Sequence, residues 1–218
     1  MEKFSFMKFV KISFLTLGLS SLVFTSCKSD DDDPKNQNNF TDIDVPGQML
    51  DLDGIHVVYP ENHTFGVWNQ GTIKIPVGGK NYTFDYFLTM DTLSKNVRIH
   101  YYLLSDPSTA NPTDVDVIAD LFKNSSYAPD AGHELLSDET VSFAGYDSRK
   151  LTANQFAYLD KDTYKLVKLD TTIYKERYVF YDNDTKKLFT VSMEMPEPLK
   201  DSRRAELYDI ISSIKVNK

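Results

Sequence analysis

The sequence predicts an α+β fold in which a largely antiparallel β-sheet is covered by amphipathic helices. From Gly54 onward, apolar and polar residues alternate over many short runs, which is the pattern of half-buried strands. Short turn sequences join several of these runs, which favours antiparallel hairpins. Two other segments repeat apolar residues at intervals of three and four, as amphipathic helices do. Strands and helices in separate runs indicate α+β layers rather than alternating βαβ units.

The first strands form a hairpin that is followed by a third strand. Residues 72–77 and 82–89 alternate on either side of the turn sequence Gly78–Asn81. Its two glycines supply the positive φ angles that a tight hairpin turn needs. Residues 97–103 continue the alternation as the third strand. Pro76 cannot donate a backbone hydrogen bond, so it predicts an edge strand or the end of a strand.

A helix is predicted next, from about Asn111 to Asn124. Asn111 or Thr113 is suited to cap it, Pro112 fits the first turn, and Asp114 favours the positive end of the helix dipole. Its apolar face consists of Val115, Ile118, Ala119 and Phe122.

Four or five further strands and a closing helix complete the domain. The strands are expected at residues 139–143, 147–157, 164–169, 174–181 and 188–195. Asp182–Thr185 reads as a hairpin loop, and Pro196 and Pro198 end the sheet. The last helix is capped by Asp201 or Ser202. Its apolar face is Leu207, Ile210, Ile211 and Ile214. We expect the two helices to cover at least one face of the sheet.

A progression of short motifs over roughly residues 53–218 resembles the PsbP-like domain. The motifs are Val57–Pro60, Asn96–Ile99, Ala144–Tyr146, Tyr178–Tyr181, Leu188–Val191 and Ile210–Val216. The closing Ser-Ser-Ile-Lys-Val is the most recognisable of them. The resemblance implies an α/β/α sandwich and a binding or accessory role rather than catalysis. It brings no catalytic motif and no cofactor.

The N-terminus reads as the leader of a lipoprotein. Three lysines precede an apolar stretch from Ile12 to Phe24, which is shorter than the roughly 20 residues that a spanning helix needs. Cys27, the only cysteine, follows after Thr25 and Ser26 and resembles the acylated cysteine of a bacterial lipobox. The next residues resemble the export tag of Bacteroidota surface lipoproteins. These are Ser29, Asp30, Asp31, Asp32 and Asp33.

This interpretation divides the chain into three parts. Residues 1–26 form a signal peptide, residues 27–41 an acylated cysteine with a disordered acidic tether, and residues 42–218 a single domain. The tether contains too few apolar side chains to fold. The resemblances imply an outer-membrane, lipid-anchored protein that faces the exterior. Two alternatives stay open: a chance cysteine near a secretory leader, and aspartates that act only as a hydrated spacer.

Charge restricts the class of partner. The net charge is −8 and no run of Lys or Arg appears, which argues against nucleic acid and against peripheral binding to anionic lipid. The membrane link is therefore expected to be the acyl chain alone. Because acylation consumes Cys27, no thiol remains for a disulfide or a nucleophile.

No catalytic or metal motif is found in the sequence. The four histidines lack the spacing of a helical zinc site, and no Gly-x-Ser-x-Gly elbow or phosphate loop occurs. His56 and His63, with Asp53, form a weak metal candidate, and two partly exposed histidines are the favoured interpretation. Asp182–Asp184 faintly suggests calcium, but a plain hairpin turn is favoured. We therefore predict no catalytic residue, no metal and no cofactor.

Aromatic residues provide the one candidate ligand platform. Trp68, the only tryptophan, lies among polar residues, and such a ring can stack on a sugar. Tyr101 and Tyr102 extend this possible platform, as does the pair Tyr174 and Tyr178. The alternative is that these rings belong to the sheet and its core.

The function predicted from these observations is a non-enzymatic binding or accessory role at the cell envelope. The expected partner is an envelope protein or an extracellular glycan. The alternative from another class is a hydrolase that acts on glycans or peptides outside the cell. An enzyme needs a cleft with converging carboxylates or histidines, whereas a binding module needs only an aromatic or apolar patch.

Overall fold

The computed structural model describes residues 41–42, 49–52, 55–60, 64–105, 110–160 and 162–216. The predicted leader, Cys27 and the export tag Ser29–Asp33 lie outside the described residues, as do Asp53 and His63. In the described part of the chain, no helix is long and apolar enough to cross a membrane.

An eight-stranded antiparallel sheet forms the centre of the domain, in the order β1-β4-β5-β6-β10-β9-β8-β7. Its strands are β1 (Thr41–Asp42), β4 (Phe65–Val77), β5 (Lys80–Asp91), β6 (Arg98–Leu104), β7 (His133–Phe143), β8 (Tyr146–Leu159), β9 (Leu166–Asp182) and β10 (Lys187–Pro196). Tight turns join β4 to β5, β7 to β8 and β9 to β10, so the predicted antiparallel sheet is confirmed.

A second, three-stranded sheet has the order β11-β3-β2. It consists of β2 (Met49–Leu52), β3 (Ile55–Val58) and β11 (Lys215–Val216). The last strand follows the closing helix directly and pairs antiparallel with β3.

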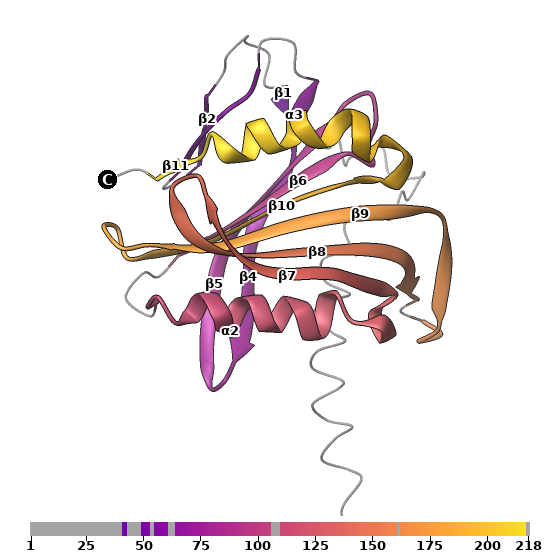
Figure 1. Cartoon of the computed structure of the whole chain (residues 1–218), viewed down its shortest axis with the longest axis horizontal. Helices are drawn as coiled ribbons and strands as arrows, with labels where there is room; N and C mark the ends of the chain where they lie inside the picture. The colour runs from indigo at the N-terminus through magenta and orange to yellow at the C-terminus, as the bar shows by residue number, and fades with distance from the viewer. Residues whose placement is uncertain are drawn as a thin grey trace, which may run out of the picture.

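Two helices cover opposite faces of the large sheet. Helix α2 (Asp114–Leu121) lies on one face and continues into a π-helical turn, η3 (Phe122–Ser126), while α3 (Lys200–Ser212) lies on the other face (Figure 1). Short 3₁₀ turns, η4 (Pro129–Ala131) and η5 (Glu197–Leu199), precede β7 and α3. The predicted α/β/α sandwich is therefore confirmed.

Each face of the sheet has its own apolar core. On the α3 side, buried residues such as Ile99, Phe180 and Val191 pack against Leu207 and Ile211. The α2 side has a separate core of Tyr102, Leu104, Ile118, Phe122, Leu151, Val179 and Leu188. Successive strand residues point to opposite faces, so both sets of alternate positions are buried where both faces are covered.

The start of α2 differs from the expected cap. Thr113 occupies the N-cap position without a side-chain hydrogen bond to the helix, and Asn111 Oδ1 instead accepts from the Thr113 backbone N–H at 3.1 Å. The buried Asp114 carboxylate accepts from the Asn111 backbone N–H at 3.0 Å and from Lys80 Nζ at 3.2 Å. This carboxylate therefore ties the helix start to the hairpin of β4 and β5.

Helix α3 is fixed to the sheet by two buried carboxylates. Glu176 of β9 accepts from Arg204 Nε and Nη2, both at 2.8 Å, and from the hydroxyl of Tyr174 at 2.8 Å. Burial would raise the pKa of Glu176, but these bonds hold the pKa below its ordinary value. Asp91 at the end of β5 lies 2.7 Å from Arg203 Nη2. Both arginines come from the first turns of the helix.

Candidate functional site

The predicted platform of exposed aromatic residues is wrong for Tyr101 and Tyr102. Their side chains are 0% and 1% exposed, and as neighbours on β6 they point to opposite faces of the sheet. The Tyr101 hydroxyl lies 2.9 Å from that of Tyr59 in the α3-side core. Tyr174 and Tyr178 are buried too. Both faces of the sheet are covered, so tyrosines on either face become core residues.

Trp68 is half-buried at a β-bulge rather than fully exposed. The register between β4 and β5 shifts between Val67 and Asn69, so Trp68 is the extra residue of the bulge. Strand β5 separates it from β6 in the sheet order. The structure therefore does not bring Trp68 and Tyr101 together.

The largest group of exposed apolar residues lies elsewhere, at the far end of the β8–β9 hairpin. These side chains are between 37% and 64% exposed. They are Phe156, Tyr158, Tyr164, Leu166 and Val167. Phe156 lies where the pairing of β8 with β9 is irregular, because Gln155 pairs with Ile173 and Ala157 with Lys168, which leaves residues 169–172 of β9 outside this pairing. The sequence did not indicate this cluster, because its aromatic residues are separated along the chain and only the hairpin brings them together.

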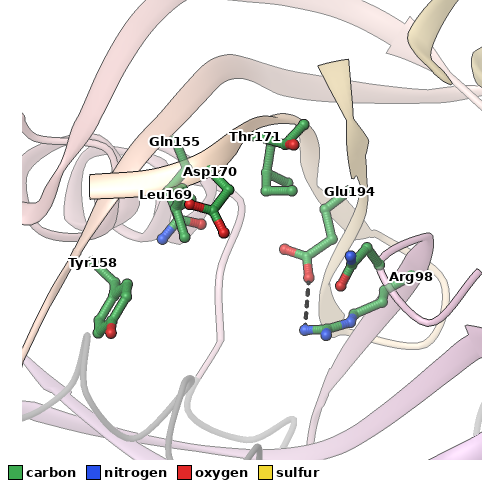
Figure 2. A pocket seen from close by; sticks show the side chains of 9 residues that line it. Arg98, Gln155, Tyr158, Leu169, Asp170, Thr171 and Glu194 are labelled. Carbon is green, nitrogen blue, oxygen red and sulfur yellow. Dashed lines mark hydrogen bonds and ion pairs between the residues drawn. The ribbon is translucent and has the colours of Figure 1, made fainter. Parts of the chain in front are cut away.

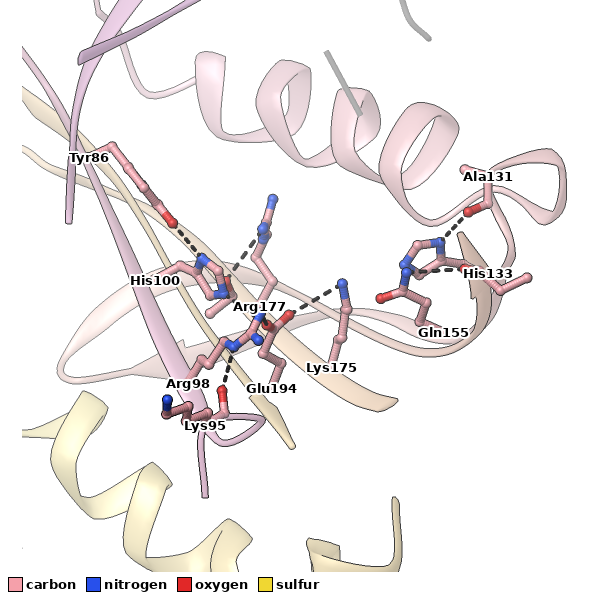
Figure 3. A network of polar contacts seen from close by, with 12 residues as sticks. Tyr86, Lys95, Arg98, His100, Ala131, His133, Gln155, Lys175, Arg177 and Glu194 are labelled. Atoms are coloured by element: carbon pink, nitrogen blue, oxygen red, sulfur yellow. Dashed lines mark hydrogen bonds and ion pairs between the residues drawn. The ribbon is translucent and has the colours of Figure 1, made fainter. Parts of the chain in front are cut away.

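A buried charged cluster lies on the face of the sheet that α2 covers, at the end beyond the apolar core (Figure 3). Its buried members are His100 on β6, Lys175 and Arg177 on β9, and Glu194 on β10, and the half-buried Arg98 of β6 completes it. They occupy alternate positions of neighbouring strands, which is why their side chains meet on one face. Charged residues at alternate strand positions usually face solvent, so the sequence gives no signal of this cluster.

Glu194 is the shared partner of three of these basic groups. Its carboxylate lies 3.4 Å from Arg98 Nη1, 3.2 Å from His100 Nε2 and 3.3 Å from Lys175 Nζ. Burial would raise the pKa of Glu194, but Lys175, His100 and Arg98 together hold the pKa well below its ordinary value. Glu194 is therefore ionised near neutral pH and is not a proton donor there.

Burial has the opposite effect on the basic partners of Glu194. It lowers the pKa of His100 and of Lys175, and the attraction of Glu194 offsets this only in part. His100 Nδ1 also lies 3.1 Å from the Tyr86 hydroxyl. The imidazole is thereby fixed between β5 and β10.

Arg177 differs from the other basic residues of the cluster. Its Nη2 donates to Ser192 Oγ at 3.3 Å, and its guanidinium carbon lies 3.6 Å from the centre of the Phe122 ring. The rings of Tyr102 and Tyr127 lie at 5.4 and 5.6 Å. Stacking on aromatic faces stabilises a buried guanidinium. Its N–H groups point outward in the plane of the guanidinium itself, so stacking leaves them available for hydrogen bonds.

Two hollows open near this cluster. The strand-end hollow has a volume of about 550 Å³, and Figure 2 shows Arg98 and Glu194 on one side of it with Tyr158, Gln155 and Asp170 opposite. Its lining is largely polar. Asn96, Leu169, Thr171 and Ile173 complete it.

The helix-side hollow, about 410 Å³ in volume, lies between β4, β5 and the end of α2. Residues 69–75 of β4 form one wall, and Leu121, Phe122, Ser125 and Ser126 form the other. Tyr86 and Tyr102 line its floor on the sheet. Asn69 and Gln70, the amides that follow Trp68, therefore do line a hollow, although Trp68 itself does not.

Of the metal candidates His56, His63 and Asp53, only His56 lies among the described residues. Among the described residues, no group of three His, Cys, Asp or Glu side chains could hold a metal ion. His133 is buried with Nδ1 3.0 Å from the Ala131 carbonyl oxygen, and burial lowers its pKa to about 3. Asp182 accepts from the Thr185 backbone N–H at 2.7 Å, which is the hairpin turn that was favoured over calcium.

Comparisons with known proteins support the fold. No family model and no curated protein matches the chain. The solution structure of cyanobacterial PsbP (CyanoP) from Synechocystis sp. PCC 6803 is similar, with 18% identity and a TM-score of 0.50, over 78% of this chain and 92% of that one. The domain therefore has the PsbP-like fold.

Two other solved structures are more distant. The Ran-binding protein Mog1p of Saccharomyces cerevisiae is 14% identical over 79% of this chain and 96% of that one, with a TM-score of 0.41. LpqN of Mycobacterium tuberculosis, which is involved in cell envelope biogenesis, is 8% identical over 78% and 90%, with a TM-score of 0.35. At these scores neither supports an argument about function.

Proposed function

We propose that this chain is a lipid-anchored outer-membrane protein whose PsbP-like domain binds a small molecule without chemically changing it. The observation that carries the proposal is the helix-side hollow of about 410 Å³. Its walls are mainly apolar and aromatic, with a few amides and hydroxyls and the exposed Lys74 among the lining residues, as is typical of small-molecule pockets. The volume suits a ligand of about ten to twenty non-hydrogen atoms.

Binding in this hollow is testable with a neutral apolar probe. We expect 1-octanol to receive saturation transfer from the full-length protein in ligand-observed NMR, because its chain fits the apolar walls. Ser125→Trp would fill the hollow and should abolish the signal. Ser142→Trp, at an exposed position on β7, is the matched control and should leave it unchanged. Equal signals from the two variants would mean that octanol binds elsewhere and would refute the assigned pocket.

The anchor part of the proposal rests on the sequence of the N-terminal segment. A sole cysteine directly after an apolar leader, followed by Ser29 and four aspartates, is the pattern that supports acylation and export. Metabolic labelling with an alkyne palmitate should mark the wild-type protein and not Cys27→Ser. Label retained by Cys27→Ser would contradict lipid attachment at this residue.

The outward orientation is a separate claim with its own measurement. Protease added to intact cells should digest the domain while a periplasmic marker survives. Replacing Asp30–Asp33 by alanine should protect the domain, if these residues carry the sorting information. A mutant as accessible as wild type would mean that the run is only a hydrated spacer.

The hydrolase alternative receives less support from the geometry. Two carboxylates, Glu194 and Asp170, line the strand-end hollow. Glycoside cleavage needs one carboxyl group that is protonated at the working pH. Arg98, His100 and Lys175 surround Glu194 and hold it ionised. The arrangement therefore favours binding over acid catalysis.

A further inference from the structure

Arg177 is a buried positive charge without a carboxylate partner among the described residues. Arg177 is only 6% exposed. Among the described residues, no Asp or Glu oxygen lies within ion-pair distance of its guanidinium. Lys175 and Arg98 share Glu194, the one carboxylate of the cluster. A guanidinium stays charged at any physiological pH, so burying it without a counter-charge is costly.

Unused hydrogen-bond donors surround this charge. Arg177 Nε and Nη1 are buried and make no hydrogen bond with the described part of the chain. The buried hydroxyls of Tyr127 and Thr190 are also without hydrogen-bond partners among the described residues. Buried donors in folded proteins are nearly always paired, and a group that is not requires an explanation. A set that consists of a cation and hydroxyl groups is suited to an acceptor that carries negative charge.

The π-helical turn η3 builds this environment. The Tyr127 backbone N–H donates to the Phe122 carbonyl oxygen at 2.9 Å, an interval of five residues. This interval lets both rings approach the guanidinium, Phe122 at 3.6 Å and Tyr127 at 5.6 Å. Single π-helical turns within α-helices are frequent at functional sites.

The same rings connect Arg177 to the helix-side hollow. Tyr102 and Phe122, which flank the guanidinium, both line that hollow. Arg177 itself does not line the hollow, and its positive charge lies behind these two rings at the edge of a mainly apolar pocket. A ligand that matches both features has an apolar body and one negatively charged end.

We infer that the helix-side hollow takes an organic monoanion, namely a carboxylate with an apolar body, whose acidic group pairs with Arg177. The inference rests on the proposed binding function and adds the chemical class of the ligand. One negative charge balances the one guanidinium that lacks a partner. The apolar walls formed by Ile73, Ile75 and Leu121 select against small hydrated anions such as free phosphate.

Octanoate and 1-octanol form a matched pair of probes that differ in charge at nearly the same chain length. With the full-length protein at pH 7, we expect the Kd of octanoate to be about tenfold lower than that of octanol, as for one charge-assisted hydrogen-bonded pair. In Arg177→Met, whose side chain keeps the apolar packing on Phe122, the two probes should bind equally. Arg177→Gln is a second neutral variant should the methionine variant not fold.

Arg98→Met is the control, because Arg98 lies on the same face but lines the other hollow. It should keep the preference for octanoate. Octanol binding without a preference for octanoate in wild type would overturn this inference and leave the binding function standing. A preference that survives in both Arg177 variants would also overturn it. Binding of neither probe to wild type would refute the proposed pocket itself.

Discussion

At the scale of single residues, the α2 face of the sheet keeps several ionisable groups in an unusual state. His133 is the simplest of them, since its imidazole lies buried at the start of β7 with one hydrogen bond, to the Ala131 carbonyl oxygen. Burial, with some repulsion from Lys175, lowers the pKa of His133 to about 3. The native state therefore holds this side chain neutral where the unfolded chain would protonate it.

This lowered pKa predicts a loss of stability in mild acid. Between the ordinary pKa of about 6.5 and the folded value of about 3, only the unfolded state binds the proton. The free energy of unfolding should therefore fall as the pH falls through this window, with a limiting slope of about 1.4 kcal/mol per pH unit. Urea unfolding of wild type and His133→Gln from pH 7 to 5 measures the slope. An unchanged slope in His133→Gln would assign the effect to another group.

The residue scale is also where prediction from sequence was weakest. Alternation located β6 correctly, but it could not say which set of side chains is buried when helices cover both faces. Tyr101 and Tyr102 were therefore proposed as exposed although both are buried. For the same reason Arg177 attracted no attention. A charged residue at an alternate strand position normally faces solvent, and only the tertiary arrangement shows that η3 covers it.

At the scale of elements, α3 is attached to the sheet through polar as well as apolar contacts. Leu207 and Ile211 are fully buried against the strands. The paired hydrogen bonds from Arg204 to Glu176 add a fixed orientation, because a guanidinium and a carboxylate meet in only one plane. The burial of Glu176, at 0% exposed, makes this pair sensitive to the loss of either partner.

Removing Arg204 should strongly destabilise the protein. Arg204→Ala leaves the buried negative charge of Glu176 with tyrosine hydroxyls and with Lys150 Nζ at 3.8 Å as its remaining partners, at a cost of about 3 kcal/mol in the free energy of unfolding. Chemical denaturation at pH 7 measures the cost. Asp201→Ala, at an exposed position on the same helix, is the control and should change stability by less than about 0.5 kcal/mol. A similar small effect for Arg204→Ala would show that apolar packing alone holds the helix.

Gly132 provides a second test at the scale of elements. It lies between η4 and β7 and is hydrogen-bonded to β8. Its φ is +81°, and a Cβ placed there would lie 2.4 Å from the Ala157 carbonyl oxygen. Its own carbonyl oxygen accepts from the backbone N–H groups of Phe156 and Ala157. Gly132→Ala should therefore lower the melting temperature by several degrees. Gly71→Ala, which has open space around the added Cβ, should have little effect. Equal effects would contradict the steric argument.

Elements were predicted better than their details. The hairpin at Gly78 and the helix near Ile118 occur as expected. The closing helix occurs too, but its N-cap is Leu199 rather than Asp201 or Ser202, and it ends at Ser212, before Ile214. Residues 164–169 and 174–181 were taken as two strands, whereas β9 runs without interruption from Leu166 to Asp182. Residues 169–172 pair with neither β8 nor β10, so the backbone pairing is interrupted where the polar residues lie between the two predicted runs, although the extended conformation continues. The bulge at Trp68 depends on the partner strand, so no local sequence pattern predicts it.

At the scale of the whole molecule, one sheet supports two cores that do not touch each other. Strands β6, β9 and β10 contribute side chains to both cores. Both cores therefore depend on the same three strands, and disrupting these strands would disrupt both. We predict a single cooperative unfolding transition for the domain. Fluorescence of Trp68, the only tryptophan, and far-ultraviolet circular dichroism should give coincident urea curves. Separate midpoints would show that the two sides of the sheet unfold independently.

The shared strands also restrict how the length of this chain can vary. On β9, Glu176 faces α3 and Arg177 faces α2. Inserting or deleting one residue upstream within β9 would exchange the two faces from that point on, so charges would meet the apolar underside of α3. Changes of one residue are therefore expected to be excluded from β6, from β10 and from the regularly paired part of β9 between Ile173 and Asp182. The turn after Asp182 can change length, because the number of residues in this turn does not decide which side chains of β9 and β10 point to each face of the sheet.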